Sequence, residues 1–250
     1  MQQKSDARFI SKYTHFIGIG GIGVSALARL YKSRGFEVSG SDLARSEITD
    51  ALQKEGIRVL IGRHRAANIP SAVTKVIYTS AARSDNPEIV EAKKRRIPTQ
   101  SYAQDLGEIT GQYQTVAVAG AHGKTTTTAL AALALIKAGF DPTVIIGSKL
   151  REFGSSNFRR GRSKYFVLEA DEYKASFLNY SPSIAVVTNI DREHLDFYKN
   201  VRNIESAFLK FLLKLNFGGW AVLNGDDKRL KKIGGRLRKK RGDLKVMYFS

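Results

Sequence analysis

A glycine loop followed by lysine and threonine is the stretch of this sequence best suited to chemistry. The loop reads Gly120, Ala121, His122, Gly123, Lys124, Thr125 and Thr126. It follows a short Val/Ala-rich run and precedes an Ala/Leu-rich helical pattern that extends to about Ala138. Strand, glycine loop and helix in this order are typical of a phosphate-binding loop, because backbone N–H groups and the helix N-terminus attract polyphosphate oxygens. We expect Lys124 to reach the terminal phosphates and the Thr125 hydroxyl to hold Mg²⁺.

The loop is shorter than the usual pattern, which has a further glycine five residues before the one that precedes lysine. In this chain Val118 occupies that place. The alternative interpretation is an ordinary strand–turn–helix with a threonine-rich helix start. The flanking strand and helix favour the phosphate-binding interpretation, because the mechanism needs both of them.

A second glycine motif, Gly18-Ile-Gly20-Gly21-Ile22-Gly23, lies near the N-terminus. Strands predicted at His15–Ile19 and Phe36–Ser39 flank a helix predicted at Val24–Ser33, and Asp42 follows the second strand. Glycines and an acidic residue at this spacing are typical of a dinucleotide site and, taken alone, indicate NAD. The geometry of the motif requires less than a whole dinucleotide. A diphosphate would bind the glycine backbone, and Asp42 would accept a hydrogen bond from a ribose hydroxyl.

Polar side chains also follow two later strands of the predicted fold. Glu169 comes directly after a strand predicted at Tyr165–Leu168, and His194 follows one predicted at Ser183–Thr188. The carboxyl ends of parallel strands meet at one edge of a sheet, so both residues are expected near Lys124 and Thr125, around one nucleotide. The alternatives are a solvated acidic turn after the first strand and a structural histidine after the second.

The remaining pattern predicts an α/β protein: a Rossmann-like N-terminal domain followed by an α/β ATP-binding domain with the phosphate-binding loop, which is incomplete. We place the domains at residues 1–112 and 113–250, with a linker at Gly111–Tyr113. The segment Arg151–Ser163 is predicted to be a surface loop. Further helices are predicted at Ile48–Lys54, Pro87–Arg95, Tyr102–Ile109 and Ile204–Leu215, and further strands at Val59–Ile61, Lys75–Tyr78, Pro142–Ile146, Trp220–Leu223 and Leu244–Phe249.

Composition limits the classes of function. The 250 residues contain no cysteine, which excludes disulfides, thiolate metal sites and cysteine nucleophiles. No apolar run approaches the roughly 20 residues that span a bilayer, and residues 1–13 lack a signal-peptide core, so we expect a cytoplasmic protein without membrane partners. The net charge of +18 favours anionic partners. The basic stretch Asp226–Lys245 is interpreted as a solvated helix and loop, and no nucleic-acid-binding signature accompanies it.

Taken together, these motifs resemble the Mur ligase family, whose members build the peptide stem of bacterial peptidoglycan. The residues that show the resemblance occur in family order: Gly18–Ala28, Gly40–Asp42, Gly120–Thr127, Glu169–Glu172, Ala175–Leu178 and Val187–His194. The usual loop of the family has threonine where this chain has Ala121. No single motif is decisive, but the ordered set is highly specific.

The resemblance implies ATP-dependent joining of L-alanine to UDP-N-acetylmuramate through an acyl phosphate. By position, it assigns Lys124 to the β- and γ-phosphates, Thr125 and Glu169 to a first Mg²⁺, and His194 to a second. Lys124, Glu169 and His194 are then the catalytic residues. The UDP-sugar side is assigned to Gly20, Gly21, Ile22, Gly23, Asp42 and Ser80.

Family members are much longer than this chain, which stops near the middle of the ATP-binding domain. A later Asn-containing ATP segment and a third domain, which places the amine, lie beyond it. We therefore expect a truncated product or a chain completed by a partner chain, with weak nucleotide binding and little alanine-dependent ligation. Tyr102-Ala103-Gln104 replaces the usual Arg-Ala-Glu, which bears on substrate specificity.

Two alternatives stay open at this point. One is a fragment that binds UDP-muramate or ATP without turnover. The other is an NAD(P)-dependent oxidoreductase built on Gly18–Gly23, which leaves Lys124, Thr125 and Glu169 without a role.

Overall fold

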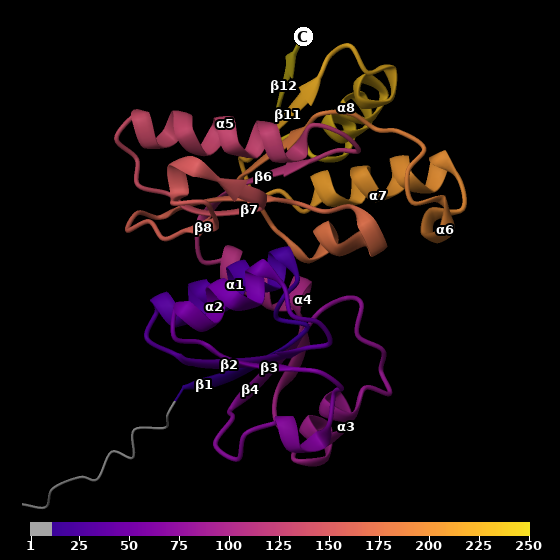
Figure 1. Cartoon of the computed structure of the whole chain (residues 1–250). Coiled ribbons are helices and arrows are strands. Elements are labelled where there is room, and N and C mark those ends of the chain that lie inside the picture. Colours follow the sequence, from indigo (N-terminus) through magenta and orange to yellow (C-terminus); the bar gives the residue numbers. More distant parts are fainter. Residues whose placement is uncertain (1–11) are drawn as a thin grey trace, which may run out of the picture. The chain divides into compact units, whose positions relative to one another are not determined.

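The structure is a computed structural model that describes residues 12–250 (Figure 1). By its internal contacts the chain divides into two compact units, one ending at Tyr102 and the other beginning at Ala103. The expectation about a signal peptide concerns residues 1–13, which lie almost entirely outside the described part. Within residues 12–250, no helix is long and apolar enough to cross a membrane.

The first unit is built on a five-stranded parallel sheet with the strand order β3-β2-β1-β4-β5. This order places the sheet's switch point between β1 and β4, where open α/β sheets bind ligands. Its elements are β1 (Tyr13–Ile17), α1 (Ile22–Ser33), β2 (Glu37–Asp42), α2 (Glu47–Lys54), β3 (Arg58–Ile61), the short 3₁₀ turn η1 (Ala66–Asn68), β4 (Lys75–Tyr78), α3 (Pro87–Lys94) and β5 (Thr99–Ser101).

Helices lie on both faces of this sheet, with α1 and α2 on one side and α3 on the other (Figure 1). All residues of β1 are buried, as expected for a central strand covered on both faces. Local signals set the helix starts. The Ser46 hydroxyl accepts from the Thr49 N–H at the start of α2, and Asn86 caps α3, which begins with Pro87.

The second unit contains a seven-stranded sheet with the order β12-β11-β10-β6-β9-β7-β8. All neighbours are parallel except β7 and β8, which are antiparallel. Its elements are α4 (Tyr102–Thr110), β6 (Gln114–Ala119), α5 (Lys124–Lys137), β7 (Thr143–Leu150), η2 (Arg151–Phe153), β8 (Ser156–Arg159), β9 (Tyr165–Glu169), η3 (Tyr173–Asn179), β10 (Ile184–Val187), α6 (Leu195–Tyr198), α7 (Val201–Leu213), β11 (Trp220–Asn224), α8 (Lys228–Lys240) and β12 (Lys245–Phe249).

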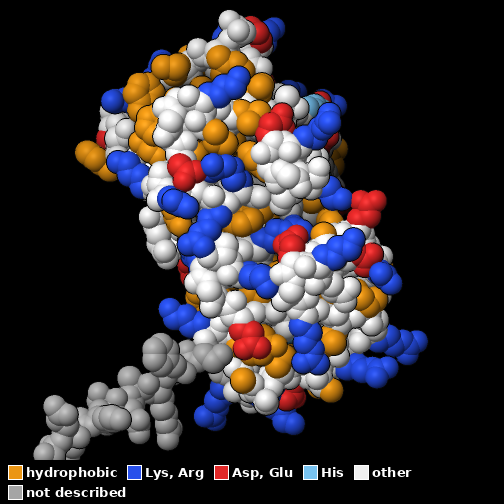
Figure 2. Space-filling model, turned by 60° about the vertical axis from the view of Figure 1, so that its left-hand side comes forward, with side chains coloured by type: hydrophobic (Ala, Val, Ile, Leu, Met, Phe, Trp, Pro, Cys, Tyr) orange, Lys and Arg blue, Asp and Glu red, His pale blue; other side chains and the backbone are white. Residues whose placement is uncertain are grey.

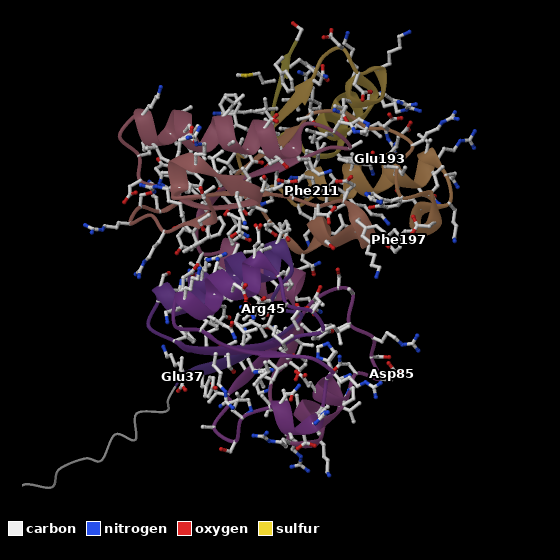
Figure 3. The ribbon with its side chains drawn as sticks, viewed as in Figure 1. Glu37, Arg45, Asp85, Glu193, Phe197 and Phe211 are labelled. Atoms are coloured by element: carbon white, nitrogen blue, oxygen red, sulfur yellow. The ribbon has the colours of Figure 1, made fainter. Side chains whose placement is uncertain are left out.

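Strand β6 is the centre of this sheet, and its end feeds directly into the glycine loop and α5. Helix α5 packs on β6, β7 and β9, whereas α8 packs on β11 and against α7. On α7, Phe211 is fully buried and stacks on Phe177 of η3 with ring centroids 4.8 Å apart (Figure 3). The sheet therefore holds the loop and the ends of β9 and β10 on a packed base.

The predicted surface loop at Arg151–Ser163 is wrong, because the segment contains η2 and strand β8. Strand β8 pairs antiparallel with β7, and Asn157 on it is buried. Gly154, with a φ of +68°, lies in the turn between the two strands. The composition concealed the hairpin: an edge strand rich in Ser, Asn and Arg lacks the apolar alternation that predicts a strand.

The basic stretch near the C-terminus is a helix, as predicted. Leu230, Ile233, Gly234 and Leu237 of α8 are buried, and lysines and arginines occupy all of its other positions except Gly235. Figure 2 shows Lys and Arg side chains scattered over the visible face and outnumbering Asp and Glu, in line with the net charge of +18.

The predicted linker Gly111–Tyr113 lies between α4 and β6. Most of α4 groups by its contacts with the second unit, and its Gly107 lies close to the backbone of Asn179. The domain boundary at residues 112 and 113 stays a prediction.

Candidate nucleotide and substrate sites

The glycine loop of the second unit has backbone conformations that require glycine. Gly120 has a φ of +139° and Gly123 a φ of +77°, both in the region that L side chains rarely adopt. A Cβ atom on Gly120 would lie 2.1 Å from the Thr188 hydroxyl oxygen. The loop therefore packs its backbone tightly against the end of β10 before it turns into α5.

Residues after β10 hold this loop in place. The His122 N–H donates to Asn189 Oδ1 over 2.8 Å, and Asn189 Nδ2 donates to the His122 carbonyl over 3.0 Å. The Thr188 hydroxyl donates to the same carbonyl over 2.6 Å. The His122 ring is exposed and lies 3.5 Å from Glu193, on the segment between β10 and α6 (Figure 3). The residues that follow β10 thus fix the loop geometry.

The Lys124 ammonium is folded back over the loop. It donates to the carbonyls of Gly120 over 2.6 Å and Ala121 over 3.1 Å, and to Glu172 Oε1 over 3.1 Å. Its distance to the other Glu172 oxygen is 3.0 Å. A positive charge is therefore held at the loop by four oxygens, two backbone carbonyls and both oxygens of one carboxylate.

Thr125 and Glu169 lie together, as the sequence predicts. The Thr125 hydroxyl donates to Glu169 Oε2 over 2.9 Å, and the Gly147 N–H donates to the same oxygen over 3.0 Å. A Cβ on Gly147 would lie only 2.7 Å from this oxygen, so glycine allows the close approach. Helix α5 supplies the hydroxyl, β9 the carboxylate and β7 the backbone donor.

His194 lies beside Glu172, and Glu172 links it to Lys124. His194 Nε2 is 3.5 Å from Glu172 Oε1, and the Tyr173 ring lies 4.7 Å from the imidazole. A possible metal site lies here: Asp171, Glu172 and His194 each offer one atom that could bind a metal ion, and these three atoms lie within 4.8 Å of one another. Burial raises the pKa of Glu172, and the nearby Lys124 charge opposes this rise. Glu172 is thus buried, unlike the alternative of a solvated acidic turn.

The other predicted residues of the loop take simpler positions. Ala121 is half-buried, and its N–H donates to the Asn189 carbonyl over 3.2 Å. Thr126 is exposed in the first turn of α5. Sequence reasoning gave no individual role to three groups that make contacts here: the buried Thr188, the amide of Asn189 and the carboxylate of Glu172. Their only signal was their place just after strands β9 and β10.

Tyr198 supports Glu172 from α6, and its removal gives a testable effect. The Tyr198 hydroxyl donates to the Glu172 carbonyl, and burial together with the Glu172 charge raises the pKa of Tyr198 to about 12. We expect Tyr198→Phe to lower the free energy of unfolding by about 1 kcal/mol. Absorbance titration of the folded wild type should show one phenol ionising near pH 12 that is missing in the variant. An identical titration of both proteins would contradict this placement.

The glycine motif of the first unit opens onto a groove of about 600 Å³. Residues that line it include Gly18, Gly21, Asp42, His64, Thr79, Arg83 and Asn86. The Gly20 N–H donates to Asp42 Oδ2 over 2.8 Å, so the predicted acidic residue also holds the loop. Ile22 and Gly23 begin α1, and Ser80 lies between Thr79 and Ala81, which both line the groove. Of the six predicted substrate-side residues, Gly21 and Asp42 line the groove, whereas Gly20, Ile22, Gly23 and Ser80 are not among its lining residues.

A buried carboxylate, which sequence reasoning missed, lies next to this groove. Glu88 of α3 has no exposed surface. Its Oε2 receives hydrogen bonds from Ser41 Oγ over 2.7 Å and His15 Nε2 over 3.1 Å. Its Oε1 receives them from Asn68 Nδ2 over 2.7 Å and His64 Nδ1 over 2.8 Å. Burial opposes the charged form, but these four hydrogen bonds together lower the pKa of Glu88 to about 2.

Comparison with known protein families matches both parts of the chain. Residues 13–114 match the model described as Mur ligase family, catalytic domain, and residues 118–250 match the Mur ligase middle domain. The chain belongs to the Mur ligase family. The predicted α/β architecture, with a Rossmann-like part and an ATP-binding middle part, is confirmed by this match and by the solved structures that resemble it.

Individual relatives show which members of the family the chain is similar to. The chain is 46% identical over 222 residues to UDP-N-acetylmuramate–L-alanine ligase of Aquifex aeolicus, and 48% identical over 223 residues to that of Acetivibrio thermocellus. These alignments cover 89% of the chain but 48% and 47% of the relatives. The chain thus spans about half the length of the curated relatives it matches.

Two solved structures are similar to most of this chain. UDP-N-acetylmuramate-alanine ligase of Thermotoga maritima has a TM-score of 0.78 and 35% identity, and the match covers 88% of this chain and 51% of that one. UDP-N-acetylmuramate:L-alanyl-gamma-D-glutamyl-meso-diaminopimelate ligase of Neisseria meningitides has a TM-score of 0.85 and 29% identity, covering 95% and 78%.

Proposed function

We propose that the protein provides the UDP-sugar and ATP sites of a cytoplasmic enzyme that joins L-alanine to UDP-N-acetylmuramate, a step in making peptidoglycan precursors for cell shape and division. The contacts at the carboxyl ends of β6, β9 and β10 carry this proposal. There Thr125 meets Glu169, and Lys124 meets Glu172 beside His194. The names of the relatives supply the substrates.

The proposed reaction uses ATP to make a carboxylate reactive. The γ-phosphoryl group passes to the muramate carboxylate, and the amine of L-alanine then attacks the acyl phosphate and expels phosphate. The glycine loop would orient the phosphates with its N–H groups, and Lys124 would exchange the carbonyls of Gly120 and Ala121 for phosphate oxygens. The enzyme's contribution is mainly positioning and charge neutralisation.

The residues at the start of α5 fit a magnesium ion. A hydroxyl and a carboxylate, the oxygen donors that Mg²⁺ prefers, already lie 2.9 Å apart at Thr125 and Glu169. We assign these two residues to a first Mg²⁺ and His194, with Asp171 and Glu172 near it, to a second. When bound, the metal would neutralise charge on the phosphate oxygens.

The magnesium assignment predicts that Thr125→Ala weakens Mg-ATP binding by roughly 10-fold, because a ligand and a donor to Glu169 are both lost. Thr125→Ser is the matched control, since it keeps the hydroxyl, and it should bind nearly as well as the wild type. Titration calorimetry with Mg-ATP compares the three proteins. Equal affinity of the alanine variant would remove Thr125 from the metal site.

The first unit should bind a UDP-sugar and ignore NAD. Its loop offers N–H groups to any diphosphate, and the family assignment favours UDP-N-acetylmuramate over a dinucleotide. Calorimetric titration of the 250-residue chain with each ligand in turn distinguishes the two. Measurable NAD binding with none for UDP-N-acetylmuramate would revive the oxidoreductase alternative.

A phosphate-release assay with ATP and UDP-N-acetylmuramate, with and without L-alanine, tests the proposed reaction. Phosphate release that depends on L-alanine supports ligation. Nucleotide binding without any release supports the alternative of a binding fragment. ATP hydrolysis unaffected by the UDP-sugar would contradict the proposed substrate.

A further inference from the structure

One face of the second unit's sheet is covered by a helix over only part of its width. Helix α5 packs on β6, β7 and β9, whereas α8 packs on β11 and β12. The two helices lie on opposite faces, because Val186 of β10 packs on the apolar cluster that includes Ala132 of α5, while Leu223 and Tyr248 lie against Gly234 of α8. In the part of the chain that the structure describes, no helix packs on β11 or β12 from the α5 side.

The uncovered part of this face is apolar. Val186, Val222 and Met247 are register partners on β10, β11 and β12, so their side chains point to the α5 side of the sheet. Met247 is 50% exposed, and Phe249, two residues further along β12, is 40% exposed. Parallel strands are normally covered by helices on both faces. These side chains therefore form a bare part of the sheet that lacks its usual second layer.

Helix α5 is also apolar on the side that points away from the sheet. Among its 14 residues only the first and the last are charged. Leu130 is 63% exposed, and Leu133 and Ala134 lie three and four positions later, which places them on the same outer stripe. A surface helix normally carries polar residues on its outer side. The outer stripe of α5 and the bare part of the sheet are thus two apolar surfaces on one side of the second unit.

We propose that two copies of the chain associate through these surfaces, with α5 of each copy packed on the bare part of the other copy's sheet. A two-fold axis repeats this contact, so each copy offers the same pair of surfaces. The 14 residues of α5 span about 21 Å, and the five residues of β11 or β12 span about 17 Å. One helix therefore covers these strands along their full length. The inference does not depend on the proposed reaction.

Two properties of the surfaces favour a second copy over another partner. A single added helix would fill the bare part of the sheet beside α5 and would leave the outer stripe of α5 exposed, whereas the two-fold arrangement covers both. The chain carries a net charge of +18, so two copies repel each other over most of their surface. The outer stripe and the bare part consist of uncharged side chains, so this repulsion is weakest where they meet.

Sedimentation equilibrium of the 250-residue chain tests the proposal. We expect a reversible dimer of twice the monomer mass of 27.7 kDa. Its dissociation constant should be about 1–100 µM, since an interface of this modest size binds weakly. Leu130→Lys and Met247→Lys should each raise the dissociation constant at least ~10-fold, because every substitution acts twice in a symmetric dimer. Val90→Lys is the matched control: Val90 is a 50% exposed helix residue of the first unit, and its lysine adds the same charge.

Cross-linking tests which surfaces meet. The chain contains no cysteine, so Leu130→Cys and Met247→Cys each introduce a unique thiol. A mixture of the two single variants, treated with a short bismaleimide, should give a covalent dimer that joins position 130 of one copy to position 247 of the other. Absence of this product, or an equal weakening by Val90→Lys, would overturn the proposal. A chain that stays monomeric at all concentrations would overturn it as well, and a helix from the half of the relatives that this chain does not match would then be the expected cover.

Discussion

Replacing Lys124 with alanine is expected to lower Mg-ATP turnover or binding by roughly 10²- to 10³-fold, the usual effect of removing a charge aimed at a transferring phosphoryl group. Lys124→Arg keeps the charge and serves as the control. It should retain more function than the alanine variant while its shape still disturbs the loop. Titration with Mg-ATP measures the effect. A Lys124→Ala variant that binds Mg-ATP as tightly as the wild type would refute the assignment of the loop.

The structure adds a second consequence, because Lys124 is also the cation beside the buried Glu172. Lys124→Ala should therefore lower the free energy of unfolding, by up to ~3 kcal/mol. Adding Glu172→Gln removes the uncompensated charge and should restore much of this stability without restoring nucleotide binding. Urea unfolding of the single and double variants separates the two effects. Recovery of Mg-ATP binding in the double variant would contradict a direct role for the lysine.

Glu88→Gln is expected to destabilise the first unit by ~3 kcal/mol at pH 7. The carboxylate has a pKa of about 2, lowered from 4.5 by four hydrogen bonds, and each pKa unit corresponds to ~1.4 kcal/mol. Because the folded-state pKa is lowered, this stabilisation is present above about pH 4.5 and is lost as the pH falls toward 2. Glutamine has one acceptor oxygen in place of two, so its NH₂ group would face the two donors that one of the carboxylate oxygens now accepts from.

Urea unfolding between pH 2 and 7 measures this effect. The wild type should lose stability toward low pH more steeply than Glu88→Gln, and the difference between the two proteins should shrink as Glu88 becomes protonated. Acid sensitivity of the same size in both proteins would show that the Glu88 carboxylate contributes little to folding.

Sequence patterns were sufficient to predict an element or a site residue where the residue's role follows from its place in a regular strand or helix. The strand Lys75–Tyr78 has the predicted bounds, and the helix after the glycine loop was predicted to within one residue of its end at Lys137. Thr125 and Glu169 were expected together because they follow neighbouring parallel strands, and they share a hydrogen bond. Periodicity and position at the end of a strand are local signals, so they can be recognised in a single sequence.

Contacts between distant segments could not be predicted in this way. His15 and Glu88 are 73 residues apart, and each residue type alone is more common at a surface or in a simple cap. The Lys124 contact with the loop carbonyls depends on the exact course of the backbone at Gly120. Strand β8 is defined by pairing with β7 and not by its own composition.

Hydrogen-exchange mass spectrometry of the 250-residue chain is the most direct test of the central claim, that one unit binds a UDP-sugar and the other Mg-ATP. UDP-N-acetylmuramate should slow exchange in peptides containing Gly18–Gly23, and Mg-ATP should slow it in peptides containing Gly120–Thr126. NAD should change neither. Protection of the first loop by NAD and not by the UDP-sugar, or no protection of the second loop by Mg-ATP, would contradict the account.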